Sequence, residues 1–122
     1  MIKWFNTKDK SGSASLYQNN ITLNTVAMSP LDYAFRVLVG IKDDQDIIIK
    51  PVTKNEVESG QLDESGLLKL DAHKSFARIA SAQLMRHIAE ELKLELSKTP
   101  LKFETSWDNE ENVLVIHVKK GA

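Results

Sequence analysis

The sequence predicts a small α+β protein in which two related strand–helix–β-hairpin units pack into one small domain. This prediction depends on short runs of β-branched residues, two capped helical segments with apolar faces, and an order of elements that repeats in the two halves. A chain of 122 residues, of which 42% are hydrophobic and 27% are charged, can enclose a core without disulfides. We therefore expect residues 1–122 to form a single domain.

The first half begins with two short strands around an Asn-Asn turn. The strands are predicted at residues 15–17 and 21–23, where apolar and β-branched residues are concentrated. A helix is predicted over residues 26–28, because Asn24 or Thr25 can accept a hydrogen bond from the free backbone N–H groups of its first turn.

A β-hairpin follows. The β-branched runs at residues 36–41 and 47–52 are separated by a polar, aspartate-rich turn, which is typical of two antiparallel strands. Residues 53–66 contain two Ser-Gly pairs and are predicted to be a connector.

The second half repeats this order. Strands are predicted at residues 67–70 and 76–79, with a loop between them. A helix is predicted over about residues 82–93, with Ser81 as its N-cap. Its apolar residues recur at every fourth position and are expected to be buried: Leu84, Ile88 and Leu92. A second hairpin is predicted over residues 103–118.

The two halves align with each other. Residues 37–52 align with residues 103–118 so that turn falls on turn and return strand on return strand, although Val52 and Val118 are the one identical pair. Upstream, residues 23–28 align with residues 79–84. We interpret this as an internal repeat of residues 14–52 and 67–118, joined by the connector 53–66. Each half would bury its apolar face against the other.

A strand, a short capped helix and a hairpin resemble the swapped-hairpin unit of AbrB-type regulators, and two such units in one chain resemble the MraZ arrangement. The local match is Leu70-Asp71-Ala72 followed by the segment from Arg78 to Arg86, which is similar to the aspartate loop, arginine, strand and helix of that family. The family pattern places the arginine four residues after the aspartate, whereas Asp71 and Arg78 are seven apart. The resemblance implies the fold and a DNA-binding regulator.

Residue types and spacings favour a non-enzymatic protein without a cofactor. Cysteine is absent, which excludes disulfides, thiolate metal ligands and cysteine nucleophiles. The histidines, His73, His87 and His117, lack the spacing of a metal-ligand set. We find no nucleophile motif and no glycine-rich phosphate loop. We therefore expect no catalytic, cofactor or metal site.

The chain is expected to be cytoplasmic and to have no contact with a membrane. Its first residues lack the apolar run of a signal peptide, and no stretch approaches the length of about 18 apolar residues that crosses a bilayer.

Charge is segregated along the sequence, although the formal net charge is only −1. Residues 1–31 contain three lysines and one aspartate, residues 67–89 contain four basic residues and one aspartate, and both predicted hairpin turns are acidic. If the two basic segments share one face, that face can contact the phosphates of DNA. The proposed DNA-contacting residues are Lys8, Lys10, Lys69, Lys74, Arg78 and Arg86.

Two functions remain open from the sequence. The first is a DNA-binding transcriptional regulator of AbrB-like type. The alternative is a non-enzymatic protein-interaction module that binds a protein partner through an apolar surface near Trp4, Phe5 or Trp107. Either function is compatible with a homo-oligomer.

Overall fold

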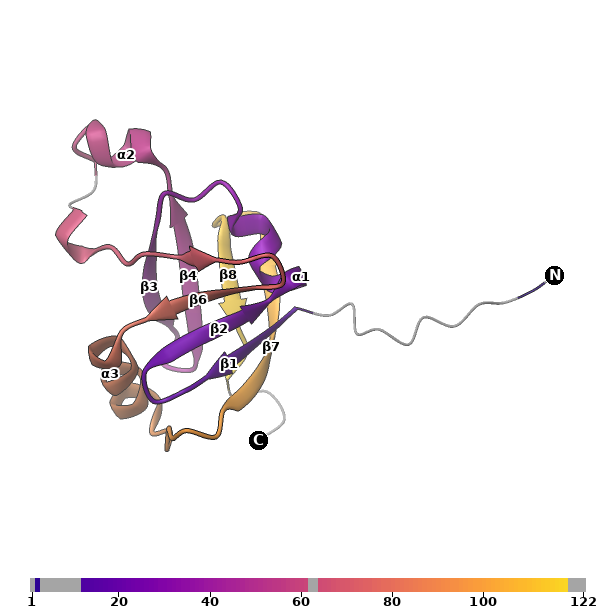
Figure 1. The fold of residues 1–122 in the computed structure, drawn as a ribbon. Helices are drawn as coiled ribbons and strands as arrows, with labels where there is room; N and C mark the ends of the chain where they lie inside the picture. Colours follow the sequence, from indigo (N-terminus) through magenta and orange to yellow (C-terminus); the bar gives the residue numbers. More distant parts are fainter. Residues whose placement is uncertain (1, 3–11, 62–63, 119–122) are drawn as a thin grey trace.

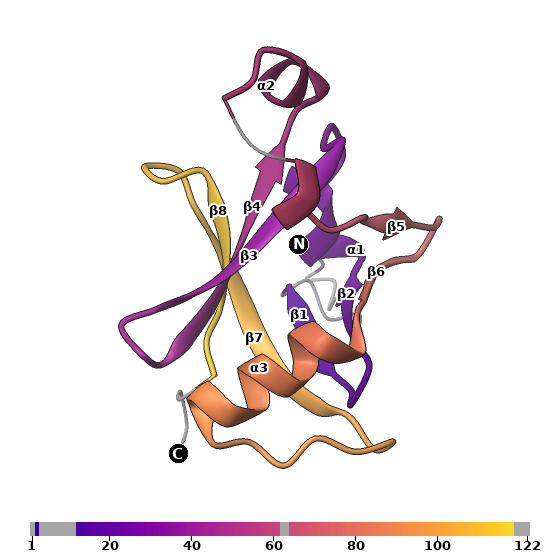
Figure 2. The same cartoon turned by 90° about the vertical axis from the view of Figure 1, so that its left-hand side faces the viewer.

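The computed structural model describes residues 2, 12–61 and 64–118, which form an antiparallel sheet of eight strands with three short α-helices (Figure 1). The sheet curls into a half-barrel, which Figure 2 shows after the molecule is turned by 90°. The strands are β1 (Ser13–Leu16), β2 (Asn20–Asn24), β3 (Arg36–Lys42), β4 (Asp46–Val52), β5 (Asp71–Ala72), β6 (Phe76–Ala80), β7 (Leu101–Asp108) and β8 (Val113–Ile116). The helices are α1 (Thr25–Met28), α2 (Lys54–Glu58) and α3 (Ala82–Leu92). The predicted α+β class is confirmed.

The spatial order of the strands is β3-β4-β8-β7-β1-β2-β6-β5. The end strands, β3 and β5, are drawn together by two backbone hydrogen bonds of 2.8 Å between Val37 and Leu68, three residues before β5 begins. This link explains why the sheet is curled rather than open, since both of its ends are held by the same segment of chain.

Alternating side chains build the core. In β1 and β2 every second residue is buried, and in β6 Ala77 and Ile79 are fully buried while Arg78 and Ala80 are exposed. This is the alternation expected of strands with one face inward and one face in water. The largest fully buried side chains come from both halves of the chain, namely Leu16, Ile21, Leu23, Leu31, Ile47, Ile49, Ile79, Met85, Ile88, Leu114, Ile116 and Val37.

Both predicted hairpins are confirmed. Strands β3 and β4 pair from Arg36 with Val52 to Lys42 with Asp46, and β7 pairs with β8. The β3–β4 turn places Asp43 and Asp44 at φ values of 55° and 54°. Two consecutive left-handed residues match the right-handed twist of a hairpin, and aspartate tolerates that conformation better than most residues.

The predicted helix over residues 82–93 is confirmed as α3, with a small correction to its buried face. The Oγ of Ser81 accepts a 3.1 Å hydrogen bond from the Leu84 N–H, as an N-cap should. The buried residues are Met85, Ile88 and Leu92, whereas Leu84 is only partly buried. The predicted burial of Leu84 is therefore wrong, because the helix is rotated so that Met85 points into the core.

Three details of the predicted elements differ from the structure. Residues 67–70 do not form a strand, and only Leu68 makes a β-bridge. The adjacent Asp71–Ala72, predicted as a loop, is β5. The connector 53–66 contains α2, whose Thr53 and Glu56 form a reciprocal capping box. In the described part of the chain no helix has both the length and the apolarity needed to cross a membrane.

Truncating the buried face of α3 tests this correction. We expect Ile88→Ala to lower the free energy of unfolding by about 2–5 kcal/mol, because a fully enclosed side chain leaves a cavity. Leu84→Ala should cost roughly half as much, because water already reaches this residue. Chemical denaturation followed by circular dichroism measures both values. Equal losses would show that Leu84 is as enclosed as Ile88.

The capping box of α2 predicts a pH dependence. Hydrogen bonds from the Thr53 backbone N–H and hydroxyl hold the pKa of Glu56 below its ordinary value. The box therefore stabilises α2 above the ordinary carboxyl pKa and is lost as pH falls through the lowered pKa of Glu56. We expect Thr53→Ala to return the pKa of Glu56 toward its ordinary value, measured by NMR titration of its side-chain carbonyl carbon. Unchanged titration in the variant would show that Thr53 does not bind this carboxylate.

Candidate nucleic-acid interface

A row of outward-facing side chains crosses five neighbouring strands of the sheet. Backbone pairing places one residue from each of β5, β6, β2, β1 and β7 side by side, and the alternation of the strands directs all of them away from the core. We call this set the outer row: Asp71, Arg78, Thr22, Ser15 and Lys102. Its charged members are the cations Arg78 and Lys102 and the anion Asp71, and the central Thr22 and Ser15 are small and uncharged.

The β5–β6 hairpin carries an aromatic surface at one end of the outer row. The ring of His73 stacks on Phe76 with 4.5 Å between centroids and an interplanar angle of 21°. The His73 Nε2 lies 3.2 Å from Asp71 Oδ2, and the guanidinium of Arg78 lies 5.2 Å from the Phe76 centroid. A planar cation beside an aromatic ring is a favourable arrangement that also holds the guanidinium in place.

The structure brings together only part of the predicted contact set. Arg78 belongs to the outer row, and Lys69 and Lys74 are exposed before β5 and in the β5–β6 turn respectively. Arg86 is exposed on α3, the element that follows β6, and lines the groove beside that helix rather than the outer row. The remaining predicted residues, Lys8 and Lys10, lie outside the described residues.

Lys102 was missed by the sequence reasoning. It lies in β7, whose exposed residues alternate with partly buried ones, so that Lys102 and Glu104 point outward. The period of two was visible in the sequence, but the pairing of β7 with β1 was not. That pairing places Lys102 opposite Ser15 and thus on the outer row.

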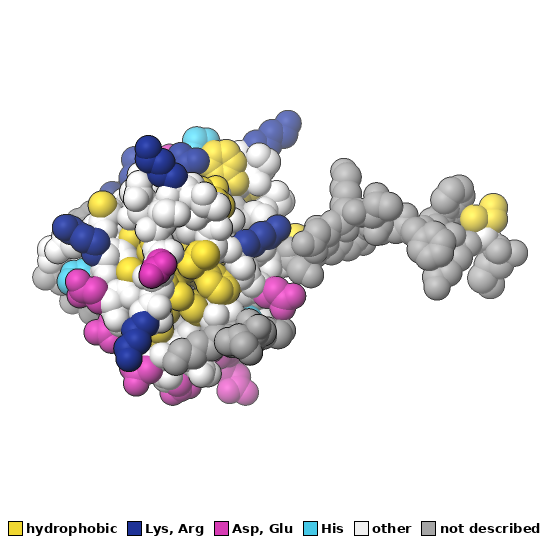
Figure 3. Space-filling model, turned by 90° about the horizontal axis from the view of Figure 1, so that it is seen from below, with side chains coloured by type: hydrophobic (Ala, Val, Ile, Leu, Met, Phe, Trp, Pro, Cys, Tyr) yellow, Lys and Arg dark blue, Asp and Glu magenta, His cyan; other side chains and the backbone are white. Residues whose placement is uncertain are grey.

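Basic and acidic side chains gather on different parts of the surface. In the view of Figure 3, most Lys and Arg side chains lie in the upper half and most Asp and Glu side chains in the lower half. Exposed carboxylates occupy both hairpin turns, with Asp43 and Asp44 between β3 and β4 and Glu110 and Glu111 between β7 and β8. A surface polarised in this way orients a polyanion toward the basic part.

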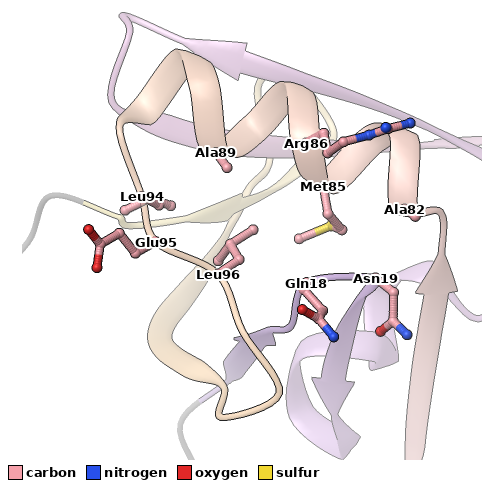
Figure 4. A pocket seen from close by; sticks show the side chains of 9 residues that line it. All are labelled: Gln18, Asn19, Ala82, Met85, Arg86, Ala89, Leu94, Glu95 and Leu96. Carbon is pink, nitrogen blue, oxygen red and sulfur yellow. The ribbon is translucent and has the colours of Figure 1, made fainter.

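A second feature is an open groove of about 730 Å³ between α3, the β1–β2 turn and the segment after α3. Figure 4 shows Met85, whose side chain is fully buried, at the base of this groove beside α3, with Leu96 facing it and Gln18 and Asn19 on the opposite side. Arg86 extends along the helix at its rim. The groove combines an apolar floor with a polar border, as protein-binding surfaces do.

Folding also brings together Ser106 and His117, whose Oγ and Nε2 are 2.7 Å apart on an exposed part of β7 and the end of β8. A serine nucleophile also needs oxyanion donors and a group that orients the imidazole, so this contact alone does not define an active site. Among the described residues no three His, Asp or Glu side chains are grouped so that they could hold a metal ion.

Trp107 is partly buried and packs against the core, whereas Trp4 and Phe5 lie outside the described residues. Comparison with known proteins found no matching family model, no matching curated sequence and no matching solved structure.

Proposed function

We propose that the chain is a non-enzymatic, cytoplasmic DNA-binding regulator of AbrB-like type, built from two related units. The observation that carries this proposal is the outer row with the adjoining β5–β6 hairpin, where exposed cations lie on the outer, polar face of the curled sheet. The main binding residues are Arg78 and Lys102, with Lys69 and Lys74 at the hairpin.

The strand order supports the idea of two units. Exchanging β1 with β5, β2 with β6, β3 with β7 and β4 with β8 reverses the order within each half of the sheet and leaves every pair of neighbouring strands in that half unchanged. The halves β3-β4-β8-β7 and β1-β2-β6-β5 are both palindromic under this exchange. Two copies of one unit related by a twofold axis produce this order.

The pairing register supports the same axis. The alignment of the two halves sets Thr22 over Arg78, and these residues are paired at the centre of β2 and β6. In the hairpins the same alignment makes Ile48 equivalent to Leu114 and Ile49 equivalent to Val115. The observed pairs are Ile48 with Val115 and Ile49 with Leu114, which a twofold axis between the two pairs requires.

The two units have diverged at their helices. After β2, the side chain of Asn24 accepts a hydrogen bond from the Ala27 N–H, and after β6 the cap is Ser81, one position later in the alignment. Helix α1 has 4 residues and α3 has 11. We infer that the basic β5–β6 hairpin gives the second unit the larger share of DNA contacts.

The affinity expected from this surface is modest. Four cations make at most a handful of phosphate contacts, so binding should fall steeply as salt is raised. The guanidinium of Arg78 can bind two phosphate oxygens or a guanine edge at once, whereas lysines act as point charges. Arg78 is therefore the residue on which any sequence preference depends.

Fluorescence polarisation with fragments of genomic DNA across a salt series tests the proposal. We expect Arg78→Ala to weaken binding by about 1–3 kcal/mol if bases are contacted, and Lys102→Ala to weaken it evenly across sequences while reducing the salt slope by about one. Arg86→Ala should have a smaller effect than Arg78→Ala, because Arg86 lies on α3 and outside the outer row.

The matched control removes charge from the β3–β4 turn. Asp43→Asn with Asp44→Asn keeps side chains that tolerate positive φ and should leave DNA affinity nearly unchanged. The absence of DNA binding by the wild-type protein at low salt would refute the proposal. So would unchanged binding by a folded Arg78→Ala, Lys102→Ala double variant.

The second candidate function is a protein-interaction module that uses the groove beside α3. The partly buried apolar lining formed by Leu94 and Leu96 is the observation that favours it. If this function is correct, Leu96→Lys should abolish partner binding and leave the DNA measurement unaffected.

A further inference from the structure

The edge of β3 is open over a short stretch. The N–H and C=O of Val37 both point away from β4, because they bond to Leu68. Backbone groups of an antiparallel strand alternate in direction, so those of Val39 and Ile41 also point away from β4. Among the described residues, no backbone group pairs with them there.

A groove of about 310 Å³ runs beside this open edge. Helix α3 forms its other wall, so that the strand and the helix supply apolar side chains on both sides. Two carboxylates lie at its border, one from the β3–β4 turn and one from the last turn of α3. The lining residues that matter are Val39, Ile41, Leu84, Ile88, Asp44 and Glu91.

We propose that this groove binds an extended, basic peptide segment of a partner protein, which adds to β3 as a further strand. Four unpaired backbone groups, the N–H and C=O of Val39 and Ile41, provide the hydrogen bonds of strand addition. Side chains of the peptide that point toward α3 enter the apolar groove, and a lysine or arginine beside them meets Asp44 and Glu91.

The length of the open edge decides in favour of a peptide. At one end Leu68 already occupies the edge opposite Val37, and at the other end the chain turns at Asp43. Only residues 39–41 remain, and α3 stands beside them. A second copy of the chain would have to pass a whole edge strand through this gap, whereas a single extended segment needs only its own width.

The structure contains an example of such pairing at the other hairpin. Strand β1 lies against the edge of β7, with small and apolar residues, Ala14 and Leu16, turned to the core and Ser13 and Ser15 turned outward. We therefore expect the peptide to alternate apolar and polar residues, with the basic residue near the apolar one.

Selection from a displayed library of random seven-residue peptides on the full chain tests the proposal. We expect enriched sequences that alternate apolar residues with Lys or Arg, and the synthetic peptide of the most enriched sequence should slow hydrogen exchange at the amides of Val39 and Ile41. Failure to enrich any sequence, or protection confined to the groove around Met85, would overturn the proposal.

Two variants test whether the carboxylates at the border of the groove contribute to peptide binding. Asp44→Asn and Glu91→Gln should each weaken peptide binding by about two- to fivefold, as expected for exposed charge pairs. Glu90→Gln is the matched control, because Glu90 is exposed on the same helix and does not line the groove. Equal effects of Glu90→Gln and Glu91→Gln would refute the predicted contact.

The backbone contribution is tested on both partners. Val39→Pro removes an outward N–H without removing a hydrogen bond to β4 and should abolish binding. If that variant does not fold, peptides methylated on the backbone nitrogens that face β3 should fail to bind, whereas methylation of the intervening nitrogens should be tolerated. Light scattering measures whether the edge instead joins two copies of the chain. A dimer for the wild-type protein and a monomer for the Val39→Pro variant would assign this edge to a second copy and overturn the proposal.

Discussion

Strands β1, β2 and β6 turn alternate side chains into one enclosed core, and the rest of the structure depends on this alternation. It places Ala77 and Ile79 inside and Arg78 outside within three residues of β6. A shift of one residue in β6 would exchange its two faces and bury the charge of Arg78. The same constraint that encloses the core therefore also fixes which polar side chains meet on the outer row.

The helices contribute few residues to the core, and the strands that precede them fix where they begin. Helix α1 has a single buried residue, Ala27, and begins directly where β2 ends, with Asn24 serving both as the last residue of the strand and as the cap of the helix. Helix α3 buries three residues and closes one open side of the curl. Helix α3 lies beside β3 but does not cover the edge of this strand, so a groove remains between the helix and the strand.

Local pattern was sufficient to predict the hairpins, the two capped helices and most strand positions, because these depend on turn residues and on periodicity. It was not sufficient for Leu68 and β5, since a single bridge and a two-residue strand depend on which distant segment lies alongside. The contact set was predicted in part for the same reason. Charge counts identified Arg78, but only the register of β1 with β7 adds Lys102 to the same row. The stacking of His73 on Phe76 likewise depends on the geometry of a turn that the pattern described only as a loop.

The pairings of β1 with β7, β2 with β6 and β4 with β8 all join strands from before residue 53 to strands from after residue 66. The β1–β2 and β3–β4 pairs can form from the first half of the chain alone, whereas these three pairings need most of the chain, so closure of the sheet is expected to be the slow step of folding. A protease cut within residues 53–66 would leave two fragments that hold each other through these same strand pairs. Each fragment alone would expose apolar strand edges that invite aggregation.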